Sequence, residues 1–191
     1  MLLAALPLLL AGSAQAKDRP ISDHTNAVSV VLSAAIEPRL ELDFDHALSD
    51  QNSFTAGATF GRANNLITRL FNAASESLGG EDLKTTQMGA YGSFNRHFKH
   101  FNRGWYASGI VRFDRFASTY GDDPAGGYNQ LAVGPAIGWK VATEGGFTFK
   151  WDLGLGYGAR FGVEEGTADV TVTAPKSGIA GLGGLNLGFS F

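Results

Sequence analysis

Residues 146–163 alternate between two kinds of side chain more strictly than any other part of the chain. Large or small apolar residues occupy every second position: Phe147, Phe149, Trp151, Leu153, Leu155, Tyr157, Ala159, Phe161 and Val163. The positions between them carry Thr148, Lys150, Asp152, Gly154, Gly156, Gly158, Arg160 and Gly162. Because successive side chains of a β-strand point to opposite faces, this pattern predicts a strand with one apolar and one polar face. Its length exceeds that of most strands in soluble domains and favours a membrane-spanning sheet.

The end of the chain repeats the alternation and stops on an aromatic residue, in the order Leu185-Asn186-Leu187-Gly188-Phe189-Ser190-Phe191. Terminal residues that nothing ties down are commonly disordered, whereas this pattern predicts a strand that closes a sheet on itself. The tail resembles the C-terminal signal of bacterial outer-membrane barrels. The resemblance implies that Leu187, Phe189 and Phe191 form an assembly signal for the barrel-insertion machinery.

The same alternation predicts strands at residues 178–191, 128–141, 105–117, 87–100 and 53–61. In residues 26–47, apolar side chains occupy every second position on both sides of Pro38. These residues therefore form either one over-long strand or two strands. We favour two, because proline interrupts a strand and single-chain bacterial barrels have an even number of strands. The predicted fold is therefore all-β, an eight-stranded antiparallel up-and-down transmembrane β-barrel over residues 26–191.

The connections between these strands alternate in length. Short turns at residues 49–52, 101–104 and 143–146 alternate with longer segments at residues 64–85, 118–127 and 164–177. Short turns on the periplasmic side and long loops on the outer side are typical of outer-membrane barrels. Trp105, Trp139 and Trp151 all lie beside short turns, which predicts a periplasmic aromatic girdle.

Residues 1–16 predict a secretory signal peptide, with an apolar run from Leu2 to Leu10 and a small-residue cleavage motif at residues 14–16. Cleavage there leaves residues 17–25 as a periplasmic N-terminal segment. No later stretch is long and apolar enough for a transmembrane helix of about 18 residues. Export and an aromatic C-terminal strand together indicate the bacterial outer membrane, with its lipids as partners.

Composition excludes several other classes of protein. The chain has no cysteine, so no disulfide framework stabilises it. Its formal net charge of -3 gives no sign of a nucleic-acid partner. We expect a monomer without a cofactor.

The polar faces of the predicted strands carry charges of both signs. They are Glu41, Asp43, Asp45, Arg112, Asp114, Lys140, Lys150, Asp152 and Arg160. An eight-stranded barrel is just wide enough for its own side chains, and an unpaired buried charge costs several kcal/mol. These residues are therefore predicted to form a charge-paired network that largely plugs the lumen. The alternative is a narrow, porin-like path for small solutes.

This layout resembles the small bacterial outer-membrane barrels of the OmpA/OmpX-like type. The resemblance covers the barrel domain in architecture only, and the peptidoglycan-binding domain that the OmpA type often carries is not expected. It implies a structural or surface-contact role in the bacterial envelope.

An enzyme is the remaining alternative, because some small outer-membrane barrels modify lipid A. Such chemistry needs a base within hydrogen-bond reach of the hydroxyl that it activates. His46, His97 and His100 lie beside short turns and His24 in the N-terminal segment, away from the outer leaflet. The spacing of His97 and His100 places them on opposite faces of a strand, so neither a catalytic residue nor a metal site is predicted.

Overall fold

The computed structural model describes residues 23–32, 39–63, 83–167 and 176–191. Its strands are β1 (Asn26–Val31), β2 (Arg39–Ser49), β3 (Asn52–Arg62), β4 (Leu83–His97), β5 (Arg103–Tyr120), β6 (Asp123–Ala142), β7 (Phe147–Glu165), β8 (Gly178–Leu182) and β9 (Leu185–Ser190). Within these ranges, no helix has the length and hydropathy needed to cross a membrane. The predicted signal peptide at residues 1–16 and residues 17–22 of the N-terminal segment lie outside the described residues.

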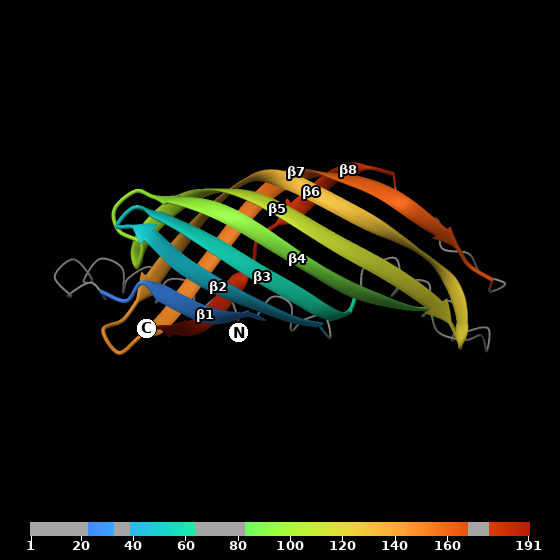
Figure 1. Cartoon of the computed structure of the whole chain (residues 1–191), viewed down its shortest axis with the longest axis horizontal. Helices are drawn as coiled ribbons and strands as arrows, with labels where there is room; N and C mark the ends of the chain where they lie inside the picture. The colour runs from blue at the N-terminus through green and yellow to red at the C-terminus, as the bar shows by residue number, and fades with distance from the viewer. Residues whose placement is uncertain (1–22, 33–38, 64–82, 168–175) are drawn as a thin grey trace, which may run out of the picture.

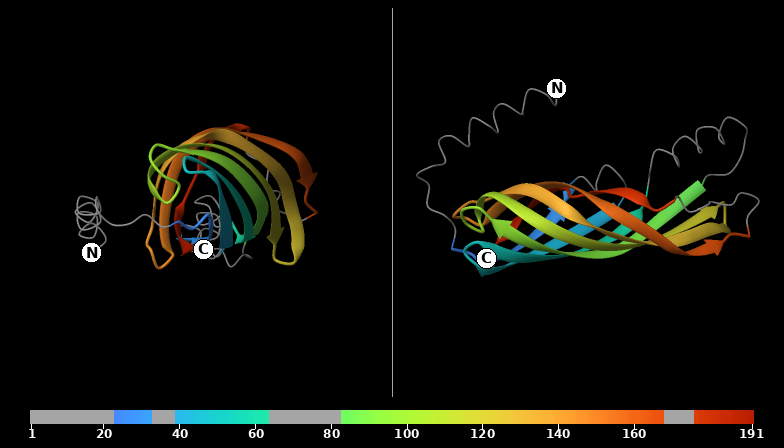
Figure 2. Two further views of the ribbon diagram at one scale, coloured as in Figure 1. Left: turned by 60° about the vertical axis from the view of Figure 1, so that its left-hand side comes forward. Right: turned by 90° about the horizontal axis from the view of Figure 1, so that it is seen from above.

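The strands form one antiparallel sheet that closes in a ring of eight strands (Figures 1 and 2). Each strand from β1 to β7 pairs with the next one along the chain. Strand β9 closes the ring, because it pairs with β7 on one side and with β1 on the other. The predicted all-β class and the antiparallel closure by the C-terminal strand are confirmed.

Residues 26–47 form two strands, as predicted. Strands β1 and β2 pair antiparallel, with Val28 opposite Phe44 and Val30 opposite Leu42. The residues around Pro38, at 33–38, lie outside the described part of the chain.

The predicted continuous strand at residues 178–191 is interrupted near its middle. Strands β8 and β9 pair with β7 in one register, with Leu182 opposite Gly154 and Leu185 opposite Trp151. Gly183 lies between them and has a φ of 115°, a conformation that favours glycine. Strands β8 and β9 are therefore two halves of the eighth strand of the ring.

The two ends of the ring differ. The turns between β2 and β3, β4 and β5, and β6 and β7 lie at one end, which we call the turn end, together with the C-terminus (Figure 1, left). At the opposite end, which we call the loop end, β5 and β6 extend further than predicted. Residues 118–127 were expected to form a long loop, but Tyr120 pairs with Asp123, so a two-residue turn joins the strands. The prediction is wrong there, because residues rich in glycine and aspartate continue the sheet through a bulge between Ser118 and Thr119.

The two faces of the sheet differ sharply in character. Side chains of the apolar set point outward and remain exposed, such as Leu153 (69%), Leu155 (66%) and Tyr157 (61%). Among the described residues, 21 buried side chains are polar or charged and 12 are hydrophobic. The interior of the ring is thus largely polar.

Candidate functional site: the charged interior

Strand β2 places three acidic side chains inside the ring. Glu41, Asp43 and Asp45 occupy alternate positions and are all nearly inaccessible to solvent. Inward positions on one strand are two residues apart, which corresponds to roughly 7 Å. The three carboxylates therefore form a ladder that runs from Glu41, nearer the loop end, to Asp45, nearer the turn end.

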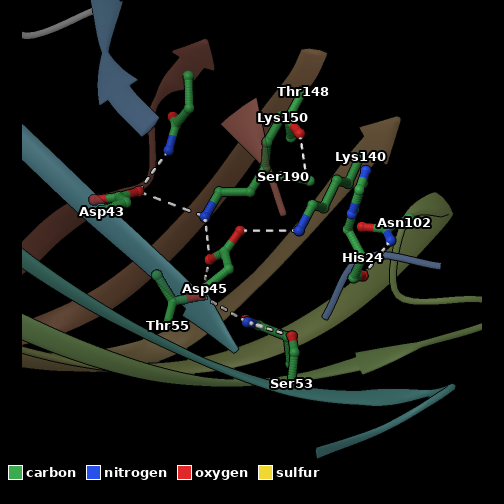
Figure 3. Close-up of polar contacts among 12 residues, drawn as sticks. His24, Asp43, Asp45, Ser53, Thr55, Asn102, Lys140, Thr148, Lys150 and Ser190 are labelled. Atoms are coloured by element: carbon green, nitrogen blue, oxygen red, sulfur yellow. Dashed lines mark hydrogen bonds and ion pairs between the residues drawn. The ribbon is translucent and has the colours of Figure 1, made fainter. Parts of the chain in front are cut away.

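Two lysines from the adjacent strands β6 and β7 form ion pairs with the carboxylates nearer the turn end. Lys140 of β6 lies with its Nζ 3.1 Å from Asp45 Oδ2, and Lys150 of β7 with its Nζ 3.1 Å from Asp45 Oδ1. Lys150 Nζ is also 3.4 Å from Asp43 Oδ2, and the Thr55 hydroxyl donates to Asp45 Oδ1 at 2.6 Å. Figure 3 shows both lysines converging on Asp45. We call these residues the turn-end cluster.

A second group of paired charges lies nearer the loop end. The Arg112 guanidinium of β5 contacts Glu41 through two nitrogens, at 3.1 and 3.2 Å. Its Nε donates to Asp114 Oδ2 at 2.8 Å. Gln87 donates to the other Asp114 oxygen at 2.8 Å, and Thr59 to Glu41 at 2.8 Å. We call these residues the loop-end cluster, in which each carboxylate also has a neutral donor, as buried charges require.

Tyr91 of β4 connects the two clusters. Its hydroxyl donates a short hydrogen bond to Asp43, and the Arg112 guanidinium lies 5.6 Å from the centre of its ring. The ring is accommodated because its partner in the register is Gly57, where a Cβ would lie 2.1 Å from a ring carbon. In the sequence, the contact of Tyr91 with both clusters was indicated only by its inward-facing position in the predicted strand at residues 87–100.

The structure brings together most of the side chains predicted for the charge network. Those with an ion pair are Glu41, Asp43, Asp45, Arg112, Asp114, Lys140 and Lys150. Asp152 instead accepts a hydrogen bond from the Tyr106 hydroxyl at 3.3 Å. Arg160 lies nearer the loop end, where it donates to Gln130 Oε1 at 3.0 Å and to the Lys176 carbonyl.

The turn end is closed by a chain segment that the sequence indicated only as a turn. Phe101 is 1% exposed, and Lys140 Nζ lies 3.5 Å from the centre of its ring. The neighbouring Asn102 donates from its side chain to the His24 carbonyl at 2.7 Å, and its own carbonyl accepts from the Ala142 amide at 2.9 Å. Figure 3 shows Asn102 beside His24. We call Phe101 and Asn102 the turn-end plug.

The histidines make local contacts. His97 Nε2 lies 2.9 Å from Ser53 Oγ, and both residues are almost fully buried. His46 contacts Asn26 at 2.8 Å, and His100 accepts from the Asn102 amide at 3.2 Å. In the described part of the chain, no three His, Cys, Asp or Glu side chains are grouped to hold a metal ion.

The three tryptophans lie side by side on the outer face. Trp105 of β5 pairs with Trp139 of β6, which pairs with Trp151 of β7. The rings of Trp105 and Trp151 are 5.4 Å apart and nearly perpendicular. They form a continuous aromatic row near the turn end.

The residues of the predicted assembly signal line the closing strand. Leu187 and Phe189 lie opposite Val30 and Val28 of β1. Phe191 follows the strand, and its backbone exchanges two hydrogen bonds with Asn26 at 2.9 and 3.1 Å. Phe189 and Phe191 are each 55% exposed on the outer side.

Part of the interior near the loop-end cluster is packed with apolar side chains. An apolar group of Ile110, Ala132, Ala136 and Leu182 packs beside the loop-end cluster. A cavity of about 20 Å³ lies beside the loop-end cluster, and its lining includes Ile110, Leu182, Glu41 and Arg112. Since one water needs roughly 10–15 Å³, the cavity holds about one water-sized species. The arrangement holds charges in fixed pairs.

Comparison of the chain with protein-family models, curated proteins and solved structures finds no match.

Proposed function

We propose that the chain is an integral β-barrel protein of the bacterial outer membrane, with a lumen closed by paired charges and a structural or surface-contact role. One observation carries this proposal: the distribution of side chains is reversed from that of a protein surrounded by water. Charged residues are enclosed, while large apolar residues cover the outside. A large contiguous exposed apolar surface marks a site of contact with another protein or with a membrane. Because this surface runs around the whole ring, a lipid bilayer fits it best.

The borders of the exposed apolar surface also support the proposal. Across the strands, Val111, Val133 and Tyr157 are neighbours, and each is at least half exposed. The tryptophan row borders this apolar band toward the turn end, as expected of an interfacial girdle. Toward the loop end, Arg115 pairs with Glu164 at 2.8 Å on the exposed side. The band therefore lies between an aromatic and a charged border.

The proposal predicts that an outward charge costs more at the middle of the band than near its edge. Leu155 lies at the middle of the apolar run of β7, and Val163 near its loop end. In a bilayer, Leu155→Arg should destabilise the folded protein by about 2–4 kcal/mol and Val163→Arg by about 0–1 kcal/mol. Urea unfolding after refolding into lipid vesicles measures both values.

A ring that functions in water would give a different result. Both positions are exposed, so each substitution would then change stability by at most about 0.5 kcal/mol. Equal small effects at Leu155 and Val163 would contradict the membrane proposal.

The filled interior supports a closed lumen. In planar bilayers we expect no steady conductance from the wild-type protein, because Phe101 and both charge clusters occupy the ring cross-section. Reproducible single-channel steps would refute the plugged lumen and favour a narrow channel for small solutes.

A further inference from the structure

The enclosed charges do not balance. The interior carboxylates among the described residues are Glu41, Asp43, Asp45, Asp114 and Asp152. The cations on the inward faces are Arg112, Lys140 and Lys150 and, nearer the loop end, Arg160. One negative charge is therefore left over among these groups. An uncompensated buried charge is costly, so the interior needs additional positive charge.

The cavity beside the loop-end cluster is lined by two of these carboxylates. Its lining includes Glu41 and Asp152, together with Asn186 of β9. Asn186 is 2% exposed, and its Oδ1 has no hydrogen-bond partner in the described part of the chain. Its Nδ2 donates to Asp43 Oδ2 at 2.6 Å, so the orientation of the amide is set and Oδ1 is left as a free acceptor.

The donors that line the cavity are already engaged elsewhere. The Tyr91 hydroxyl donates to Asp43. Arg112 donates to Glu41, Asp114 and Thr59. Glu41 accepts from Arg112 and Thr59, and Asp152 Oδ2 accepts from Tyr106. The acceptor of the lining that has no partner among the described residues is Asn186 Oδ1, which a cation or a hydrogen-bond donor would satisfy.

We propose that this cavity binds one dehydrated alkali-metal cation, Na⁺ or K⁺, between the carboxylates of Glu41 and Asp152 and the Asn186 carbonyl oxygen. The cavity has room for one water-sized species, and K⁺ is close to water in size. A divalent ion such as Mg²⁺ keeps several waters in its shell, for which this space is too small. The inference rests on the interior alone and does not depend on the membrane proposal.

Thallium(I), which replaces K⁺ and scatters anomalously, tests the site directly. Crystals of the full chain grown in potassium nitrate and soaked in thallium(I) nitrate should show an anomalous peak in the cavity. The peak should be absent in Asp152→Asn, which removes one of the two carboxylates that line the cavity. The peak should persist in the matched control Glu165→Gln, since Glu165 is exposed to solvent and does not line the cavity. A wild-type cavity without an anomalous peak would overturn the proposal and indicate that protons neutralise the carboxylates.

A solution measurement covers the case in which Asp152→Asn does not fold well. A ligand that binds only the folded state stabilises it in proportion to the logarithm of its concentration above Kd. The unfolding temperature of the wild type in detergent should therefore be higher in potassium nitrate than in N-methylglucamine nitrate at equal ionic strength. The same K⁺-dependent increase in Glu165→Gln and its loss in Asn186→Leu would support the site. An identical unfolding temperature in both salts would overturn it.

Discussion

At the scale of single residues, Lys140 has two partners of different kinds. Its ammonium group pairs with Asp45 at 3.1 Å and lies 3.5 Å from the centre of the Phe101 ring. It thus connects the turn-end cluster with the turn-end plug. We expect Lys140→Met, which keeps the apolar stem, to destabilise the protein by about 3 kcal/mol, because Asp45 loses one of two buried cationic partners. Urea unfolding in detergent measures this change.

Two comparisons make the Lys140 prediction specific. Lys99→Met removes an exposed lysine at the same end and should change stability by at most about 0.5 kcal/mol. In a double-mutant cycle with Phe101→Leu, Lys140→Met should show a coupling of about 1 kcal/mol. Additive effects would show that the cation and the ring are energetically independent.

The residues of the charged interior were predictable to different degrees. Inward parity identified Glu41 and Lys150, because a strand position determines the face of the sheet. Parity does not determine the partner, so it gave no reason to expect Arg160 to bond with Gln130 rather than with a carboxylate. Phe101 was missed, because the conformation of a turn decides whether its side chain enters the ring.

At the scale of the elements, the junction of β8 and β9 has a specific backbone requirement. Gly183 has a φ of 115°, and a Cβ there would lie 2.3 Å from the Asp152 carbonyl oxygen. We expect Gly183→Ala to destabilise the fold by about 1–3 kcal/mol. Gly181 on the same strand has open space around its Cβ position, so Gly181→Ala should be neutral or stabilising by up to about 1 kcal/mol. Equal unfolding midpoints for the two variants would show that the junction tolerates side chains.

The alternation of side chains predicted the strands well but their ends poorly. It failed at the β5–β6 hairpin, where Gly121, Pro124 and Gly126 are typical of a loop, although the strands pair as far as Tyr120 and Asp123. It also hid the break at Gly183, because β8 and β9 keep one register against β7. The backbone conformation at a glycine or proline does not change which neighbouring residues are apolar, so the alternation cannot reveal it.

At the scale of the whole molecule, the ring depends on a short closing seam. Strands β1 and β9 share the register from Ala27–Ser190 to Val31–Asn186. Because the chain has no native cysteine, the seam can be tested by cross-linking. Val28→Cys with Phe189→Cys should form a disulfide after refolding and oxidation in detergent, since the two residues are direct partners.

The matched control for the seam is Val28→Cys with Leu185→Cys. Leu185 lies four residues from the Val28 partner, so its Cα is beyond the distance that a disulfide spans, about 7 Å. Mass spectrometry of the unreduced protein should show the bond in the first pair alone. Free thiols in both pairs would mean that the ring is open in solution.

The length of β5 and β6 has a practical consequence for labelling. Their two-residue turn stands at the far loop end, and Asp122, Asp123 and Pro124 are exposed there. Insertions are tolerated best at exposed tips of this kind. An epitope peptide placed between Gly121 and Asp122 would be held away from the rest of the molecule by two paired strands, so that an antibody binds it while the ring stays folded.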